Sequence, residues 1–254
     1  MMTPFAIIGT QRSGTTFLRR SLDDHPDIVC HGELFRPAHV ESFHSPALRA
    51  AMPGKQDRDA APVAYLDRLL SFYLAGFVGF KLLLAHSPAV LEEIARRRYR
   101  LIVLQRENAL AKYSSLMIFL AMSDSGDRFR RPANEGPDAV KATFDGAEFD
   151  KYRRGEADRW AAFRAICQRY EPPRCELEYD EMAWGDGLGM ALDFLGAPRR
   201  LLDAGIVKQN SADIISRFGN PDNVRDYLNR YGLERWAIEG PEPIAGEMES
   251  AALG

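Results

Sequence analysis

The sequence has few cysteines and little net charge, and each shortage argues against a class of protein. Its three cysteines show no metal-ligand spacing and leave an odd thiol, which fits a reducing compartment better than a disulfide framework. The formal net charge of −3 argues against a protein whose main partner is a nucleic-acid backbone. Any site for an anion must therefore be a local cluster of cations.

The sequence also lacks a long apolar run. No stretch approaches the roughly 18 uninterrupted apolar residues expected of a membrane-spanning helix, and the N-terminus shows no secretory signal pattern. The most apolar window, residues 70–80, is too short to span a bilayer, and we interpret it as core. These absences predict a cytoplasmic protein without a transmembrane segment.

What the sequence does contain is an alternation of strand-like and helix-like segments. Apolar runs at residues 5–8, 77–84 and 100–106 are each followed by a segment typical of a helix. The length of 254 residues lies at the upper end of what one hydrophobic core supports. We therefore predict one α/β domain over residues 1–254, with a mostly parallel sheet flanked by helices on both faces.

The second half of the chain continues this pattern with one irregular interruption. Residues 156–170 predict an amphipathic helix, residues 174–182 contain a short strand, and residues 187–195 predict a helix closed by a glycine. Residues 128–155 are rich in Arg, Pro, Gly and Asp with little periodicity, so we predict a surface loop or lid there. The tail over residues 241–254 is expected to be frayed.

The stretch FAIIGTQRSGTTFL, residues 5–18, has the spacing of a phosphate-binding loop. Gly9 and Gly14 permit a tight turn between a strand and a helix, where backbone N–H groups and the positive helix end attract an anion. Arg12 adds a planar cationic fork suited to phosphate oxygens. The loop therefore predicts a P-loop-like anion site, although a glycine-rich turn that binds nothing would share its glycines.

One residue of the loop differs from the phosphate-binding loop of enzymes that use ATP or GTP. Thr15 stands where those enzymes have the lysine that contacts the β- and γ-phosphates. The later strand ends carry Lys81 and Arg106 instead of the acidic residue that would hold Mg²⁺. A donor whose transferred group needs no metal fits this loop better, so the pattern favours sulfuryl transfer without a metal site.

These motifs together resemble the sulfotransferase superfamily. QRSGTT, residues 11–16, is similar to the family's loop for the 5′-phosphosulfate, and RENALAKYS, residues 106–114, is similar to its strand-end Arg and later Ser that hold a 3′-phosphate. The resemblance implies 3′-phosphoadenosine 5′-phosphosulfate (PAPS) as co-substrate and 3′,5′-adenosine bisphosphate (PAP) as product. The nucleotide-binding residues that it implies in the two motifs are Arg12, Ser13, Gly14, Thr15, Thr16, Arg106 and Ser114.

The resemblance covers nearly the whole chain in order, and it points to one branch. LDDHPDIVCHGELF, residues 22–35, looks like the bacterial and Golgi carbohydrate branch, where a His-Pro pair and then a Glu follow the first helix. A KQNS turn begins at Lys208, so we expect Lys208 to reach the nucleotide as the family's late basic loop does. This turn departs from the Arg-Lys-Gly form of the cytosolic small-molecule branch.

The chemistry requires a base for the acceptor proton and a cation near the bridging oxygen. Glu33 stands where the carbohydrate branch has its catalytic carboxylate, and it is the predicted base. His86 is the rival, because the cytosolic branch takes its base from a His after the equivalent strand, but His86 lies five residues beyond Lys81 instead of two. Lys81 is expected near the transferred group. The predicted catalytic set is therefore Glu33, Lys81, Arg12 and His86.

The predicted function is in-line transfer of a sulfuryl group from PAPS to a hydroxyl of a glycan or glycoconjugate, with a carboxylate as general base. The alternatives are a sulfotransferase for a small natural-product alcohol or phenol, a P-loop kinase with a degenerate loop, and a binding module that has kept the nucleotide site. Residues 41–62 and 128–155 are variable segments in which we expect the acceptor walls. Neither the acceptor's identity nor the oligomeric state follows from the sequence.

Overall fold

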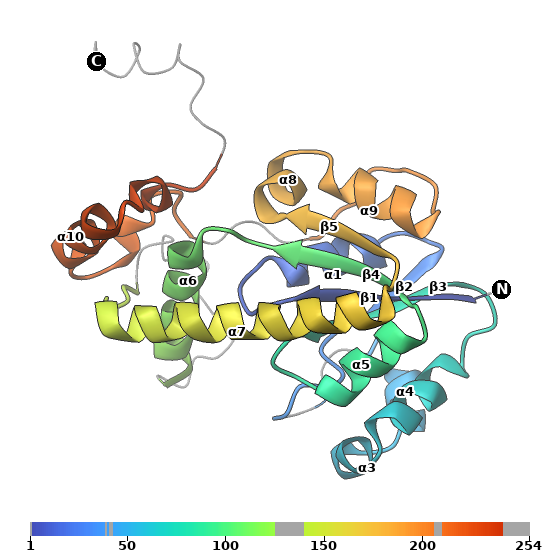
Figure 1. Cartoon of the computed structure of the whole chain (residues 1–254). Helices are drawn as coiled ribbons and strands as arrows, with labels where there is room; N and C mark the ends of the chain where they lie inside the picture. Colours follow the sequence, from blue (N-terminus) through green and yellow to red (C-terminus); the bar gives the residue numbers. More distant parts are fainter. Residues whose placement is uncertain (1, 39, 41–42, 125–139, 206–209, 241–254) are drawn as a thin grey trace.

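A five-stranded, all-parallel sheet lies at the centre of the protein (Figure 1). The structure is a computed structural model that describes residues 2–38, 40, 43–124, 140–205 and 210–240. The strands are β1 (Met2–Gly9), β2 (Ile28–His31), β3 (Gly76–Leu83), β4 (Arg100–Gln105) and β5 (Arg174–Glu178). Their order in the sheet is β2-β3-β1-β4-β5.

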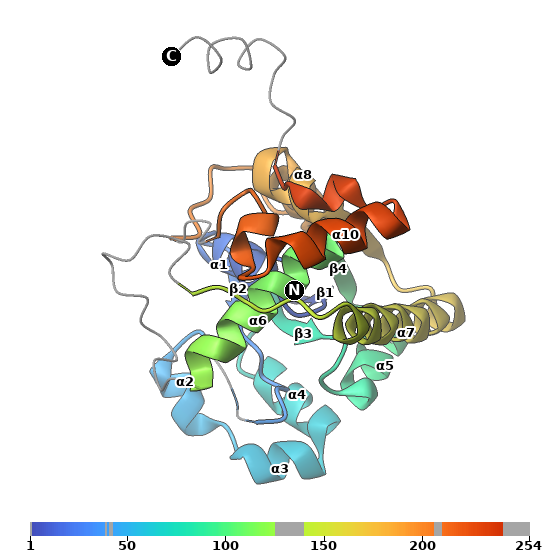
Figure 2. The ribbon, with the colours of Figure 1, turned by 90° about the vertical axis from the view of Figure 1, so that its left-hand side faces the viewer.

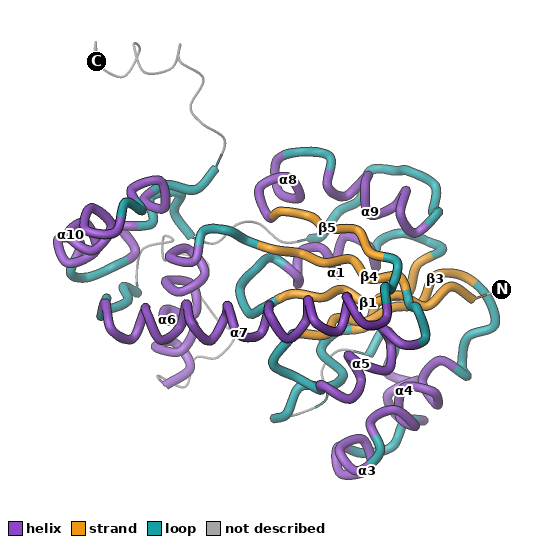
Figure 3. The backbone as a smooth tube through the Cα atoms, in the orientation of Figure 1, coloured by secondary structure: helices purple, strands orange, loops and turns teal. Residues whose placement is uncertain are grey.

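Helices cover both faces of this sheet, as Figure 3 shows. The covering helices are α1 (Thr15–Asp23), α4 (Pro62–Leu70), α5 (Pro88–Arg96), α7 (Gly146–Tyr170), α8 (Tyr179–Trp184) and α9 (Gly187–Leu195). On β1, Ala6 and Ile8 pack with α4, α5 and α7, whereas Phe5 and Ile7 pack with α1, α8 and α9. Because successive side chains point to opposite faces of a strand, one apolar run supplies both cores.

A third core cluster lies beyond the carboxyl ends of the strands. It joins the start of α7 to four further helices, which are α6 (Ala109–Asp124), η1 (Ile215–Arg217), α10 (Pro221–Tyr231) and η2 (Glu234–Ala237). The cluster is aromatic: the ring centroid of Phe149 lies 5.1 Å from that of Tyr113 and 5.6 Å from that of Phe144. Figures 1 and 2 show α6 and α10 beyond the strand ends. The last part of the described chain is therefore held close to this edge of the sheet.

Local sequence signals explain where several helices begin and end. α5 begins after Ser87, whose Oγ accepts a hydrogen bond from the N–H of Val90 at 3.4 Å. α7 begins after Asp145, whose carboxylate accepts one from the N–H of Glu148 at 3.0 Å. α9 ends at Gly196, which has a φ of 77°. This left-handed conformation suits glycine, so the predicted helix end at a glycine is confirmed.

The predicted α/β class, with a parallel sheet covered on both faces, is confirmed. The strands predicted at 77–84 and 100–106 correspond to β3 and β4. The sequence did not indicate β2 or the helices α2 (Pro46–Ala51) and α3 (Lys55–Ala60), which lie between β2 and α4. These elements have four to six residues, which is too short for a periodic pattern to stand out.

The predicted surface loop at 128–155 is wrong in its last part. α7 begins at Gly146, ten residues before the predicted helix start, so residues 146–155 are helical. This first part of α7 depends on its Asp145 cap and on Phe149 in the third core cluster, not on a continuous apolar face. The lid expected in the remainder falls largely on residues 125–139, and the frayed tail on residues 241–254, both of which lie outside the described residues.

Candidate functional site

The candidate residues follow the carboxyl ends of neighbouring parallel strands, which is where α/β sheets commonly bind ligands. The loop with Arg12 follows β1, Glu33 follows β2, His86 follows β3 and Arg106 follows β4. After β1 the chain moves to the β2 side of the sheet, and after β3 it crosses β1 to reach β4. The loop after β1 therefore stands at the point where the sheet's winding changes direction.

The loop after β1 has a backbone conformation that most residue types adopt only at a cost in free energy. Arg12 has a φ of 64° and Gly14 a φ of 93°. The left-handed region costs a non-glycine residue about 1 kcal/mol or more, so the surrounding fold imposes it on Arg12. A Cβ added at Gly9 would lie 2.7 Å from the Thr15 side chain and 2.9 Å from Ser13 Oγ. The loop therefore closes tightly onto the first turn of α1.

A buried group of one acidic side chain, Glu33, and two basic side chains, Lys81 and His86, lies beside this loop. We call these three residues the carboxylate cluster. Lys81 Nζ lies 2.5 Å from Glu33 Oε1 and donates to Thr16 Oγ1 at 2.9 Å. His86 Nε2 lies 3.6 Å from Glu33 Oε2. None of the three side chains is more than 12% exposed. Glu33 and His86, the two candidate general bases, thus share one cluster, and Lys81 connects it to the first turn of α1, directly after the loop.

The charges of this cluster control the ionisation of Glu33. Burial alone would raise the pKa of the Glu33 carboxyl, but the charge and hydrogen bond of Lys81, followed by the charge of His86, lower it below its ordinary value. Glu33 is therefore ionised at neutral pH and can accept a proton. A carboxyl with a lowered pKa is also a weaker base, so Lys81 limits the basicity of Glu33 in this arrangement.

Residues around Glu33 hold its loop in place. Arg58 of α3, with only 1% of its surface exposed, donates to the carbonyl oxygens of Leu34 at 2.8 Å and Arg36 at 2.9 Å. His31, at the end of β2, accepts a hydrogen bond at Nδ1 from a backbone N–H. Burial lowers the pKa of His31 to about 4, so this histidine is neutral near pH 7. The position of Glu33 is therefore determined by buried polar contacts on both sides of it.

A second buried group, which we call the arginine cluster, contains Arg106, Ser114, Arg217 and Glu239. Arg106 Nε and Nη2 donate to the two carboxylate oxygens of Glu239 at 2.6 and 2.5 Å. Arg217 Nη1 donates to Ser114 Oγ at 3.1 Å, and Arg217 Nη2 lies 3.7 Å from Glu239 Oε2. The predicted pair of Arg106 and Ser114 thus belongs to one cluster, joined through Arg217 and Glu239.

The arginine cluster also contacts the loop after β1. Arg106 Nη1 donates to the carbonyl oxygen of Arg12 at 2.7 Å, and Arg12 Nε donates to Ser115 Oγ at 2.9 Å. The Tyr179 ring lies 4.2 Å from the Arg106 guanidinium, and a Cβ added at Gly14 would lie 2.6 Å from the same ring. Tyr179 therefore packs the loop and Arg106 together at the end of β5.

Three residues of this site were not singled out from the sequence: Tyr179, Arg217 and Glu239. Tyr179 lies within LEYDEM, a motif of the resemblance, whereas Arg217 and Glu239 lie in a part of the chain with no motif. Burial lowers the pKa of the Arg217 guanidinium to about 10, which still leaves it charged near neutral pH. A guanidinium group presents a planar fork of donors that suits carboxylate and phosphate oxygens. Lys208, the third predicted cation, lies outside the described residues.

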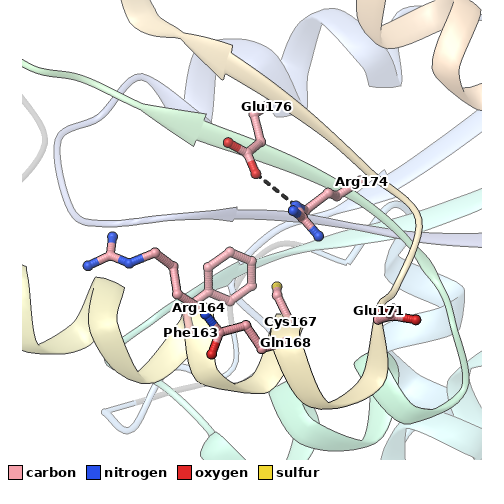
Figure 4. Close-up of a pocket in the computed structure, with 7 residues that line it drawn as sticks. All are labelled: Phe163, Arg164, Cys167, Gln168, Glu171, Arg174 and Glu176. Carbon is pink, nitrogen blue, oxygen red and sulfur yellow. Dashed lines mark hydrogen bonds and ion pairs between the residues drawn. The ribbon is translucent and has the colours of Figure 1, made fainter.

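A pocket of about 330 Å³ lies apart from these clusters, between α7 and β5 (Figure 4). Its lining includes Phe163 and Cys167 of α7, and the ion-paired Arg174 and Glu176 of β5. None of the predicted site residues lines it. Among the described residues, no group of three or more His, Cys, Asp or Glu side chains is placed to hold a metal ion. Within the same residues, no helix is both long and apolar enough to cross a membrane.

Comparison with known proteins gives matches of two kinds. Nodulation protein H of Rhizobium tropici is 25% identical over 256 aligned positions, which span 98% of this chain and 95% of that protein. A sulfotransferase of Alicyclobacillus acidocaldarius has a TM-score of 0.45 at 18% identity, covering 92% of this chain and 94% of the other. A mouse sulfotransferase complexed with PAP has the same TM-score at 12% identity, covering 92% and 86%. Structural likeness at this level assigns no residue role here.

The match to a family is local and falls on the first part of the site. A model of the sulfotransferase family matches residues 4–75. These residues include β1, the loop with Arg12, and Glu33. The resemblance to the sulfotransferase family is thereby confirmed, over the segment that carries the loop after β1 and the candidate base.

Proposed function

We propose that this protein transfers the sulfuryl group of PAPS to a hydroxyl of a saccharide or glycoconjugate. One observation carries the proposal: the loop after β1, together with the first turn of α1 that continues it, contacts both clusters. Thr16 accepts the hydrogen bond of Lys81 from the carboxylate cluster, and the carbonyl oxygen of Arg12 accepts that of Arg106 from the arginine cluster. A donor held by the loop would have a base on one side and a second anion site on the other.

The residues fit a nucleotide that carries two separate anionic groups. At Gly9 and Gly14 a Cβ would clash with neighbouring side chains, so the loop can carry no side chain at either position. A loop of this kind, with the N-terminus of α1 behind it, suits the 5′-phosphosulfate. Arg106 and Ser114, joined by Arg217, suit the 3′-phosphate, because guanidinium groups bind phosphate oxygens in pairs. Lys208 stays a predicted further contact to the nucleotide.

In the proposed reaction the acceptor's hydroxyl oxygen forms a new bond to sulfur while the bond from sulfur to the 5′-phosphate oxygen breaks. The hydroxyl proton passes to the Glu33 carboxylate, and the electron pair of the broken bond leaves with PAP. Lys81 neutralises the charge that develops on the bridging oxygen. As Lys81 turns toward that charge its hold on Glu33 weakens, which raises the pKa of Glu33 at the moment when it must take a proton.

The choice between Glu33 and His86 also bears on the acceptor. Glu33 is the member of the carboxylate cluster that contacts both of the others, so its loss would disturb the whole cluster. The saccharide class rests on Glu33 as base, together with the resemblance of residues 22–35 to the carbohydrate branch. If His86 is the base instead, a small alcohol or phenol becomes the favoured acceptor.

Ligand binding separates this proposal from the kinase alternative. A ligand at one hundred times its dissociation constant stabilises the folded state by about 2.7 kcal/mol. We expect PAP to raise the unfolding temperature clearly, and ATP with Mg²⁺ at the same concentration to raise it much less. Stronger stabilisation by ATP with Mg²⁺ than by PAP would contradict the proposal and favour a kinase.

A further inference from the structure

The arginine cluster already holds an anion that the chain itself supplies. Glu239 is 3% exposed, and its two carboxylate oxygens accept hydrogen bonds from Nε and Nη2 of Arg106. The remaining guanidinium nitrogen of Arg106, Nη1, donates to the loop at Arg12. Every nitrogen of Arg106 therefore has a partner inside the protein, and two of the three bind Glu239.

We infer that Glu239 is an autoinhibitory latch, which occupies the 3′-phosphate site and must leave it before the nucleotide binds. The inference rests on the proposed function, because it takes Arg106 and Ser114 as the 3′-phosphate site. A carboxylate offers the same two-oxygen edge to a guanidinium that a phosphate does. Glu239 thus satisfies the charge of Arg106 and lies close to Arg217.

Glu239 and a phosphate cannot share this site at low cost. A phosphate monoester carries between one and two negative charges near neutral pH, and two like charges about 4 Å apart near a protein surface repel strongly enough to change an equilibrium constant more than tenfold. Within the described residues, the cluster supplies two guanidinium groups, those of Arg106 and Arg217, and Glu239 already takes up the hydrogen bonds of two Arg106 nitrogens. Binding of the 3′-phosphate therefore displaces Glu239.

The segment that carries Glu239 lies outside the main sheet, and few backbone hydrogen bonds join it to the rest of the protein, beside those from the Asn108 side chain to the carbonyl oxygens of Trp236 and Ile238. The Glu239 N–H donates to the carbonyl oxygen of Ala212 at 2.9 Å, and the Ile214 N–H donates to that of Ala237 at 2.8 Å. These bonds surround an isolated bridge between Asp213 and Ile238, not a strand of the main sheet. A segment held by few backbone bonds opens at a lower free energy than a core strand.

Removal of the Glu239 charge tests the latch. We expect Glu239→Gln, which keeps the size of the side chain, to tighten PAP binding about tenfold or more in calorimetry. Binding of adenosine 5′-monophosphate should be unchanged, because it has no 3′-phosphate. Glu234→Gln is the matched control, since Glu234 is exposed in the same segment, and it should leave both affinities unchanged.

Three outcomes would overturn the latch: equal PAP affinity in Glu239→Gln, weaker PAP affinity, or equal tightening of both nucleotides. Weaker affinity would mean that Glu239 orients Arg106 for the phosphate. If neither nucleotide binds to the wild type or to the variant, the proposed function fails, and the latch with it. Binding of PAP by the wild type with no change in the variant would contradict the latch alone.

Hydrogen exchange provides a test that needs no variant. In the wild-type protein without ligand, the amides of Glu239 and Ile214 should be protected by their bonds to Ala212 and Ala237. Addition of PAP should increase their exchange rate, while the amides of β1 and β4 stay protected. If both amides keep or gain protection when PAP is bound, the segment stays in place and the latch is wrong.

Discussion

The carboxylate cluster and the arginine cluster lie on two sides of one loop, and each contains a buried glutamate paired with cations. In the carboxylate cluster, Glu33 is bound by one lysine and approached by one histidine, and the proposed reaction uses its charge to accept a proton. In the arginine cluster, Glu239 is bound by Arg106 and lies near Arg217, and its charge occupies an anion's place. Similar ion pairs thus have different proposed roles: Glu33 must stay ionised and in place to act as a base, whereas Glu239 must leave before the nucleotide binds.

The largest effect is expected when Glu33, the proposed general base of the carboxylate cluster, is replaced. Glu33→Gln keeps the shape of the side chain but cannot take the acceptor proton, so we expect turnover to fall by roughly 10²–10⁴-fold. PAP affinity should be unchanged, because Glu33 belongs to the other cluster. Steady-state kinetics and calorimetry on the same variant separate the two effects.

His86→Asn is the matched variant for this test, since it alters the rival base in the same cluster. We expect it to reduce turnover far less than Glu33→Gln does. If His86→Asn abolishes turnover while Glu33→Gln keeps it, the base and the family branch are both assigned wrongly.

The next largest effect concerns the arginine cluster. Arg106→Ala removes a charge-assisted contact worth roughly 1.5–3 kcal/mol, so PAP should bind about 10- to 150-fold more weakly in calorimetry. The variant should also unfold at a lower temperature, because the buried Glu239 carboxylate then loses the two hydrogen bonds that it accepts from Arg106. Arg235→Ala is the control, since Arg235 is 68% exposed and pairs with Glu107. Unchanged PAP affinity in Arg106→Ala would remove Arg106 from the nucleotide site.

The smallest effect is a shift along the pH axis. Glu33 must be ionised to act, and Lys81 is the main cause that lowers its pKa. In Lys81→Met burial prevails, so the pKa of Glu33 rises and the acid limb of the rate profile should move to higher pH, below a reduced plateau. An acid limb at the same pH in the variant would show that the group titrating there is not Glu33.

The ion pair between Glu33 and Lys81 also gives a prediction for the free energy of unfolding. A carboxyl whose pKa is lowered by folding adds stability above its unfolded pKa, and this contribution is lost as the pH falls through the folded value. The wild type should therefore be more stable than Lys81→Met near neutral pH, and the difference should shrink in acid. Thermal unfolding as a function of pH measures it. A constant difference would mean that Lys81 contributes through packing alone.

The two clusters also differ in how far the sequence could predict them. The spacing of its glycines singled out the loop, whereas Glu33 and Arg106 were assigned from the resemblance of short motifs to the sulfotransferase family. Arg217 and Glu239 reach Arg106 only because α10 and η2 pack on α6 and α7 in the third core cluster, and no local pattern encodes that contact. The pairing of Glu33 with Lys81 likewise depends on β2 lying beside β3, and β2 itself was not predicted.

The sequence also failed to predict the start of α7, because contacts with distant residues stabilise that part of the helix. Residues 146–155 are polar and contain two glycines, so their intrinsic signal for a helix is weak. Tertiary contacts of Phe149 and Tyr152 with the third core cluster supply the stability that the local sequence does not. Elements that carry their own apolar face were predictable, whereas those that depend on distant partners were not.

The most direct test of the account is a transfer assay with two labelled donors. Sulfur-labelled PAPS and γ-phosphate-labelled ATP are offered separately to the protein, each against the same panel of saccharides, glycolipids and phenols, with and without EDTA. The account predicts a sulfated saccharide from PAPS, release of one PAP for each transfer, and no loss of rate in EDTA. Phosphorylated product from ATP, lost in EDTA and restored by Mg²⁺, with no product from PAPS, would contradict it.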